Sequence, residues 1–201
     1  IEPANPIVQT RSFGSDPAMV GVDAGTWVRS CQEAGALACI KHFPGHGRTT
    51  RDSHDEVPTV DANLATLEAT DLVPFRIGIA AGVATVMTGH LRVPALDPSG
   101  TPATFSAPIL TYLRKTLGFG GLIVTDALMM GAAVKDAATN PSVRALAAGC
   151  DVLCYPADPV AAHEAITDAI RQGVLSEERV DEAMRRYGEA LLRAQLRLAS
   201  D

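Results

Sequence analysis

The sequence predicts an α/β fold with a parallel sheet, either open or closed into a barrel. Apolar strand-like runs alternate with helical segments along the 201 residues, which is typical of successive βαβ units. Polar residues follow the C-terminal ends of these runs, where parallel α/β folds place their chemistry. Four strands are evident, whereas a closed barrel has eight and usually takes about 250 residues. If the sheet is closed into a barrel, its N-terminal strands are missing from these residues, and the position of the polar residues favours the barrel over an open sheet.

Two helix-to-strand steps are predicted in the first half of the chain. Asp16 and Pro17 suit the cap and the first turn of a helix, because proline lacks the N–H that the first turn leaves unpaired. The second helix has apolar residues at helical spacing, such as Leu64, Leu67 and Phe75. The predicted elements are a helix over 17–35, a strand over 37–40, a helix over 61–82 and a strand over 84–88.

Two further strands and four helices are predicted in the second half. The run 122–125 is apolar and rich in β-branched residues, which is typical of a parallel strand buried on both faces. Ser106 and Asn140 suit the caps of the helices that follow them, and the last helix has an apolar face that fits packing on the outside of a barrel. The predicted elements are a helix over 108–117, a strand over 122–125, a helix over 140–149, a strand over 152–155, and helices over 159–172 and 176–198.

Charge and hydropathy exclude several classes of protein. The net charge is −6 and no block of Lys or Arg occurs, whereas a nucleic-acid or membrane-surface partner needs a concentrated basic face. No apolar run reaches the roughly 18 residues that span a bilayer. We therefore expect a soluble protein that binds neither nucleic acid nor membrane. We also expect a monomer, although nothing in the charge or hydropathy pattern bears on the oligomeric state.

The first residues lack the charged and apolar regions of a signal peptide, which favours a cytoplasmic protein. The opening residues 1–6 do not resemble a natural start, so a secreted or lipid-anchored protein stays an alternative.

Four cysteines lie in apolar helical or strand-like contexts, where a free thiol behaves as a small hydrophobic group. We expect buried free thiols rather than disulfides or metal ligands. The four are Cys31, Cys39, Cys150 and Cys154.

The most informative segment follows the first predicted strand. Residues 41–47 read Lys-His-Phe-Pro-Gly-His-Gly, and residues 52–54 read Asp-Ser-His. Titratable side chains broken by turn-forming residues, at the mouth of a buried strand, indicate a functional site.

These two segments, with Arg-Ser-Phe-Gly at 11–14 and Thr-Asp-Ala-Leu-Met-Met at 125–130, resemble the β-N-acetylglucosaminidases of glycoside hydrolase family 3. The similarity extends from about Asn5 to the final helix. It implies that residues 1–201 form the C-terminal part of one TIM-type catalytic barrel, whose substrate carries terminal β-linked N-acetylglucosamine, often in a peptidoglycan fragment. Because the family's first strands and another sugar-binding carboxylate have no counterpart here, we expect the chain alone to be inactive.

Asp126 is the predicted nucleophile. Retaining glycosidases usually place two carboxyl groups about 5 to 5.5 Å apart, one as nucleophile and one as acid and base. Asp126 directly follows the strand over 122–125, so its carboxylate is expected at the barrel mouth, where attack on an anomeric carbon gives a glycosyl-aspartate. The alternative is a cap for a helix that begins at Ala127. Sequence position favours neither, and the resemblance favours the nucleophile.

The resemblance assigns the acid and base role to His54 rather than to a glutamate. An imidazole with an unperturbed pKa near 6.5 can protonate the leaving oxygen and later deprotonate water. In an extended loop Asp52 points the same way as His54, so its carboxylate can accept a hydrogen bond from the ring and favour the charged form. The alternative is an ordinary solvated loop, because residues 51–56 are polar throughout.

Three basic residues are predicted to bind the sugar. Lys41 and His42 come at the end of the strand and can donate directed hydrogen bonds to hydroxyl groups, and Arg11 is expected to join them. His46 either contacts the substrate or caps the turn at 44–47, and the sequence does not decide between these.

This interpretation needs no cofactor and no metal, but three alternatives stay open. A metal-dependent hydrolase could use His42, His46, His54 and Asp52 as ligands, although the Pro-Gly between the first two denies them a helix and Lys41 adds repulsive charge. A non-catalytic protein could bind sugar without turnover. Phosphate could replace water as the acceptor, because a neutral imidazole base repels an anion less than a carboxylate does.

Overall fold

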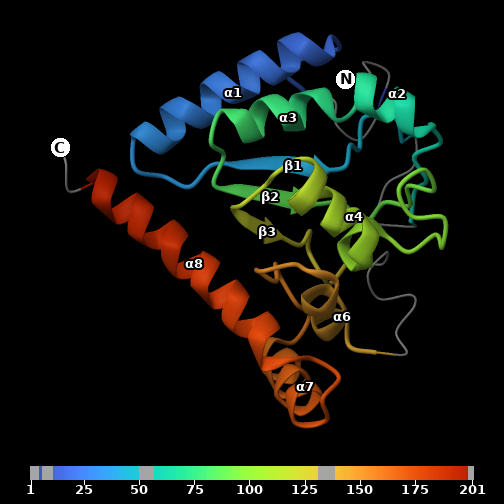
Figure 1. The fold of residues 1–201 in the computed structure, drawn as a ribbon, viewed down its shortest axis with the longest axis vertical. Coiled ribbons are helices and arrows are strands. Elements are labelled where there is room, and N and C mark those ends of the chain that lie inside the picture. Colours follow the sequence, from blue (N-terminus) through green and yellow to red (C-terminus); the bar gives the residue numbers. More distant parts are fainter. Residues whose placement is uncertain (1–4, 6–10, 50–56, 131–138, 199–201) are drawn as a thin grey trace.

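The computed structural model describes residues 5, 11–49, 57–130 and 139–198, and its centre is a parallel sheet of three strands in the order β1-β2-β3 (Figure 1). Cys39 pairs with Thr85, and Val86 with Ile123. Because the strands are parallel, their C-terminal ends meet at one edge of the sheet. The strands are β1 (Cys39–Phe43), β2 (Thr85–Thr88) and β3 (Leu122–Val124).

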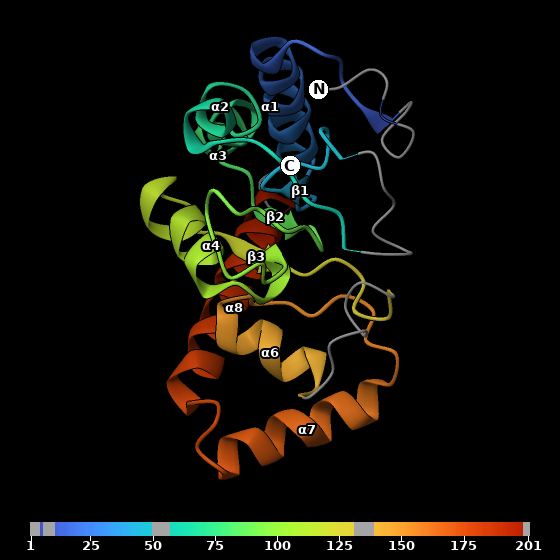
Figure 2. The same ribbon diagram turned by 90° about the vertical axis from the view of Figure 1, so that its right-hand side faces the viewer.

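Helices precede or follow each strand, as the predicted α/β class requires. Figure 1 shows α1 and α3 side by side over β1, and α8 running past β3, which it contacts. Figure 2 shows α6 between the sheet and α7. Of the described helices, none is both long and apolar enough to cross a bilayer. The helices are α1 (Pro17–Glu33), α2 (Leu64–Ala69), α3 (Val73–Ala80), α4 (Ala107–Thr111), α6 (Pro141–Ala148), α7 (Pro159–Arg171) and α8 (Glu177–Leu198), with a 3-10 turn η2 (Ala103–Phe105) and a π-helical turn η3 (Tyr112–Thr116).

The predicted caps are confirmed. Asp16 accepts a hydrogen bond from the Met19 N–H at 2.8 Å, and Ser106 and Asn140 cap α4 and α6 in the same way. Each cap satisfies an N–H group that the first helical turn leaves without a backbone partner. A proline stands in the first turn of all three helices.

The predicted helix over 61–82 is wrong as a single element, because the chain forms α2 and α3 with a break at 70–72. Pro74 lies in the first turn of α3, where its missing N–H costs nothing, but it could not have donated inside a continuous helix. The predicted helix over 108–117 likewise changes from α4 to a π-helical turn at Tyr112.

Two strand boundaries also differ from the predictions. The strand predicted over 37–40 lies at Cys39–Phe43, so Lys41 and His42 belong to the strand rather than following it. The strand predicted over 152–155 reduces to one bridge between Val152 and Val124. Two residues after Val152, the N–H of Cys154 donates to the Thr125 hydroxyl instead of to a backbone carbonyl, which ends the ladder.

The hydrophobic core lies between the sheet and the helices. Phe43, Val86 and Ile123 contribute fully buried side chains from the three strands. α1 and α3 approach so closely that a Cβ added to Gly21 would come within 2.4 Å of Ile77 Cδ1, so this contact needs glycine. All four cysteines are free thiols, as predicted, with Cys150 buried and the other three half-buried.

Candidate active site

The C-terminal edge of the sheet brings His42 and Asp126 together. His42 lies in β1 and Asp126 follows β3, yet the His42 Nε2 and Asp126 Oδ2 atoms are 3.6 Å apart. Neighbouring strands lie about 4.8 Å apart, so the two side chains meet only by leaning over the end of β2. Their side chains are 12% and 17% exposed. This places an imidazole and a carboxylate, both mostly desolvated, at the edge where parallel folds carry their sites.

The backbone after β3 holds one oxygen of the Asp126 carboxylate. Oδ1 accepts a hydrogen bond from the Ala127 N–H at 2.8 Å, while Oδ2 faces His42. Residues 127–130 form a turn, so the alternative of a helix cap at Ala127 is not supported by the described residues. One carboxylate oxygen is therefore fixed, and the other faces the end of β1.

His42 is neutral near neutral pH. Its pKa is lowered from 6.5 to about 4, chiefly by burial; Asp126 opposes the shift, and the electrostatic effects of Lys41, His46 and Arg11 add to it. At 3.6 Å the ring nitrogen is beyond ordinary hydrogen-bond distance from the carboxylate. A neutral ring does not form an ion pair with Asp126.

His46, which the sequence left unassigned, belongs to the turn after β1. Its ring is buried, its Nδ1 is hydrogen-bonded to the Thr49 hydroxyl, and its edge meets the His42 ring with centroids 5.8 Å apart. The buried amide of Asn5 donates to the carbonyls of His46 at 2.9 Å and of Gly47 and Thr49 at 2.8 Å each. No local sequence pattern predicts these hydrogen bonds, because Asn5 lies more than 40 positions away.

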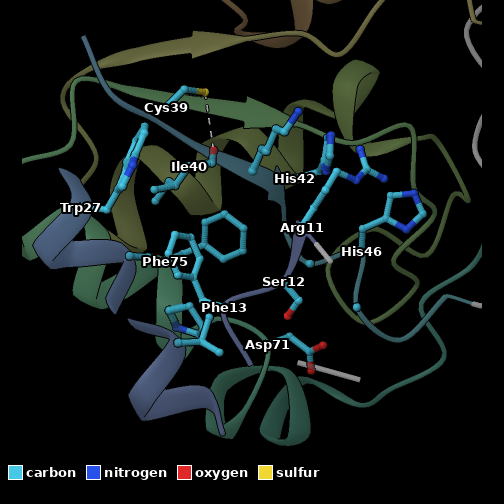
Figure 3. A pocket seen from close by; sticks show the side chains of 16 residues that line it. Arg11, Ser12, Phe13, Trp27, Cys39, Ile40, His42, His46, Asp71 and Phe75 are labelled. Carbon is cyan, nitrogen blue, oxygen red and sulfur yellow. Dashed lines mark hydrogen bonds between the residues drawn. The ribbon is translucent and has the colours of Figure 1, made fainter. Parts of the chain in front are cut away.

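A cavity of about 440 Å³ runs along the outer edge of β1 (Figure 3). Four consecutive strand residues line it, 39–42, and since successive side chains point to opposite faces, only an edge can expose all four. Arg11, Lys41 and His42, the predicted sugar-binding residues, all line this cavity. Figure 3 shows Arg11 and His46 pointing to the same part of it as His42. The structure thus brings these three predicted residues together.

The two ends of the cavity differ in polarity. The end near His42 carries the basic side chains, whereas Trp27, Ile40 and Phe75 line the other end. Asp71 also lines the cavity, with Oδ2 accepting from Arg48 Nε at 2.6 Å and a buried Oδ1 without a hydrogen-bond partner among the described residues. Asp71 was not predicted as a site residue, and its place after a helix gave no signal.

Two predicted catalytic residues lie outside the described part of the chain. They are Asp52 and His54. Within the described ranges no group of three or more His, Cys, Asp or Glu side chains is arranged to hold a metal ion. Two of the four ligands of the metal alternative, His42 and His46, are described, and their rings meet edge to face.

The chain matches the family model described as the glycosyl hydrolase family 3 N-terminal domain over residues 1–189. The chain belongs to glycosyl hydrolase family 3. This confirms the membership that the motifs at 41–47, 52–54 and 125–130 predicted.

Relatives of this family 3 chain agree in sequence and in fold. It is 36% identical over 191 residues to the beta-hexosaminidase LpqI of Mycobacterium tuberculosis, a match that covers 90% of this chain and 49% of LpqI. It superposes on a family 3 beta-N-acetylglucosaminidase from Paenibacillus sp. with a TM-score of 0.92 and 39% identity, covering 96% of this chain and 38% of that one. The beta-glucoside phosphorylase BglX gives a TM-score of 0.91 at 29% identity, over 97% of this chain and 37% of BglX. The chain thus spans half or less of these proteins.

Proposed function

We propose that the protein acts as a retaining glycosidase that removes terminal β-linked N-acetylglucosamine through a covalent intermediate on Asp126. The observation that carries this proposal is the position of the Asp126 carboxylate at the C-terminal edge of the sheet, directly after β3. One of its oxygens accepts from the Ala127 N–H and the other faces His42. The substrate class is supported by the names of similar proteins, beta-hexosaminidase and beta-N-acetylglucosaminidase.

In the first step Asp126 Oδ2 attacks the anomeric carbon, the bond to the leaving oxygen breaks, and His54 donates its proton to that oxygen. In the second step neutral His54 takes a proton from water, the resulting oxygen attacks the anomeric carbon, and Asp126 leaves as a carboxylate. Asp52 orients the His54 ring. The roles of Asp52 and His54 rest on the sequence motif at 52–54.

Neutral His42 supports this use of Asp126. A protonated imidazole 3.6 Å from the carboxylate would pair with its negative charge and weaken it as a nucleophile. The neutral ring instead offers one N–H to a sugar hydroxyl, beside the cationic groups of Arg11 and Lys41 that line the same cavity.

We propose further that residues 1–201 form the C-terminal part of one catalytic barrel. Large apolar side chains are exposed on the two helices that flank the described sheet, and β1 has a strand on one side only. Additional strands and helices would pair with that edge and cover these side chains, since large exposed apolar patches mark interfaces. The exposed residues are Met19, Val22 and Trp27 of α1, and Met184, Tyr187, Leu191 and Leu192 of α8. The chain alone should then be inactive, so experiments need the full-length protein.

Covalent trapping tests the mechanism. The full-length protein is incubated with a 5-fluoro N-acetylglucosaminyl fluoride, with and without EDTA, and the adduct is located by peptide mapping and mass spectrometry. A sugar adduct on Asp126 that survives EDTA is the expected result, and Asp126→Asn should give none. Activity that EDTA abolishes would favour the metal-dependent alternative, and binding without turnover or adduct would favour the non-catalytic one.

Phosphate is a second candidate acceptor, favoured by the similarity to the phosphorylase BglX. The discriminating measurement is product analysis in phosphate buffer and in a buffer without phosphate. N-acetylglucosamine in both buffers indicates hydrolysis, whereas a sugar 1-phosphate formed at the expense of the free sugar indicates phosphorolysis.

A further inference from the structure

A buried histidine behind the nucleophile is not used by the mechanism above. His90 follows β2 and its side chain is fully buried. Its Nε2 lies 3.1 Å from the carbonyl oxygen of Ala127, and its Nδ1 lies 2.9 Å from the Thr104 hydroxyl. The ring stacks on Phe105, with centroids 5.9 Å apart and planes at 11°. Hydrogen bonds and stacking thus fix both the position and the rotation of this ring.

The partners of the ring determine where its proton lies. A carbonyl oxygen can only accept, so the contact with Ala127 requires a proton on Nε2. Nδ1 lies 2.9 Å from the Thr104 hydroxyl, which is 3.2 Å from the Gly89 carbonyl and 2.9 Å from the Thr88 hydroxyl of β2. The single proton of the Thr104 hydroxyl can go to Nδ1 or to the Gly89 carbonyl, and Nε2 carries a proton in either case.

Ala127 connects this chain of hydrogen bonds to the nucleophile. Its carbonyl accepts from His90, and its N–H donates to Asp126 Oδ1 at 2.8 Å. The residue that holds the carboxylate is therefore itself held by a side chain anchored on β2 and η2. Supporting hydrogen bonds of this kind keep a reactive group within tenths of an ångström of its working geometry.

We propose that His90 is a positioning residue for Asp126: its Nε2–H holds the Ala127 carbonyl, and so aligns the carboxylate for attack on the anomeric carbon. This inference rests on the proposed role of Asp126 as nucleophile. His90 itself does not touch the substrate. A displacement of about 1 Å in a reacting group can reduce a rate about 100-fold, which sets the expected size of the effect.

The first test does not depend on activity. Nitrogen-15 NMR of the imidazole groups in the full-length protein reports which ring nitrogen carries the proton. The proposal requires a proton on Nε2 of His90. A neutral ring protonated on Nδ1 alone would overturn the assignment whatever the fate of the proposed reaction.

The second test compares two substitutions of similar polarity. The amide nitrogen of glutamine reaches the position of Nε2, whereas that of asparagine reaches only the position of Nδ1. His90→Asn should therefore lower kcat about 100-fold with KM nearly unchanged, and should slow formation of the sugar adduct, while His90→Gln should recover most of the rate. Equal rates in the two variants, or an asparagine variant as active as the wild type, would overturn the proposal.

Fold and function are separated by controls. Thermal unfolding of each variant shows whether a lost rate reflects a lost fold, and if both variants unfold, the NMR result alone decides the proposal. An unlabelled Asp126 in the wild type would remove the proposed function, whereas a labelled Asp126 with no dependence on His90 would remove only this inference.

Discussion

Two aspartates at opposite ends of β3 have contrasting surroundings. Asp151 lies beside the start of the strand, where its fully buried carboxylate accepts from the Ile123 N–H at 2.9 Å and from three arginines. Asp126 lies after the end of the strand, with one backbone N–H on Oδ1 and a neutral imidazole 3.6 Å from Oδ2. The carboxylate at the start is bonded on both oxygens, and the one at the end keeps an oxygen available for chemistry. The arginines are Arg114, Arg179 and Arg186.

The arginine cluster joins distant parts of the chain. Arg114 comes from η3, and Arg179 and Arg186 come from α8. Arg179 also donates to the carbonyls of Leu146 in α6 and of Cys150 after it, which holds α8 against the C-terminal end of α6. Parallel α/β folds use the N-terminal side of the sheet for stability and the C-terminal side for chemistry. The two aspartates follow this division.

The largest expected effect is on catalysis at Asp126. Asp126→Asn should reduce kcat by about 10⁴-fold or more, the scale on which removal of a catalytic residue acts, because the amide cannot form the glycosyl intermediate. Its stability should change by less than about 1 kcal/mol, since the amide oxygen can still accept from the Ala127 N–H. Steady-state kinetics and thermal unfolding measure the two effects. Near-normal turnover in this variant would make Asp126 a structural residue like Asp151.

The opposite pattern is expected at Asp151. Asp151→Asn leaves three arginines facing a neutral group in a buried site, and breaking a buried ion pair in this way costs about 3 to 5 kcal/mol. The activity of the molecules that remain folded should be unchanged. Urea unfolding gives the free energy, and Asp168→Asn is the matched control, because Asp168 forms an exposed pair with Arg171 on α7. A loss of turnover without a loss of stability would contradict the comparison.

The sequence located one of these aspartates and not the other. Asp126 was predicted because it directly follows an apolar run and lies in a family motif, both of which are local signals. The partners of Asp151 come from three positions up to 72 residues apart, at 114, 179 and 186, so no local pattern indicates them. The hydrogen bonds of Asn5 and the contact of His90 with Ala127 were missed for the same reason, as both depend on tertiary packing.

Local signals also explain which elements were predicted well. Helices with a polar cap and a following proline, such as α1 and α6, begin where the sequence places them. β1 was placed too early because the apolar run ends at Ile40 and the polar residues Lys41 and His42 were taken as its end, although the strand continues through them to buried Phe43. The polar side chains at the end of β1 line the candidate site, and they interrupt the apolar run from which the strand is predicted.

A smaller effect is expected when pH changes the charge of His42. Its pKa is about 4 in the folded protein and near 6.5 in the unfolded chain, so between these values the unfolded state binds the proton more readily. The unfolding free energy is therefore highest above pH 6.5, where His42 is neutral in both states. About 3 kcal/mol of it is lost as the pH falls from 6.5 through 4. The unfolding free energy of the wild type should therefore fall relative to that of His42→Gln as the pH is lowered from 7 to 4, and an unchanged difference between the two would contradict the lowered pKa.

The pKa of His42 also reports its interaction with Asp126. The carboxylate of Asp126 raises the pKa of His42 against the effect of burial, so Asp126→Asn should lower that pKa further. Proton NMR of the His42 ring follows it directly. An unchanged pKa in this variant would mean that the two groups do not interact in solution.

The smallest effect is expected at the exposed rim of the arginine cluster. Glu182 accepts from Arg179 at 2.9 Å and from Arg186, but its side chain is 44% exposed. Burial acts to raise its pKa, and the hydrogen bond from Arg186 together with the positive charges nearby lowers it overall. Glu182→Gln should cost less than about 1 kcal/mol, because solvent screens the pair and both arginines keep Asp151. Urea unfolding at low and high salt tests this, with the small loss disappearing at high salt. A loss as large as that of Asp151→Asn would mean that Glu182, rather than the buried aspartate, holds the two arginines of α8 in place.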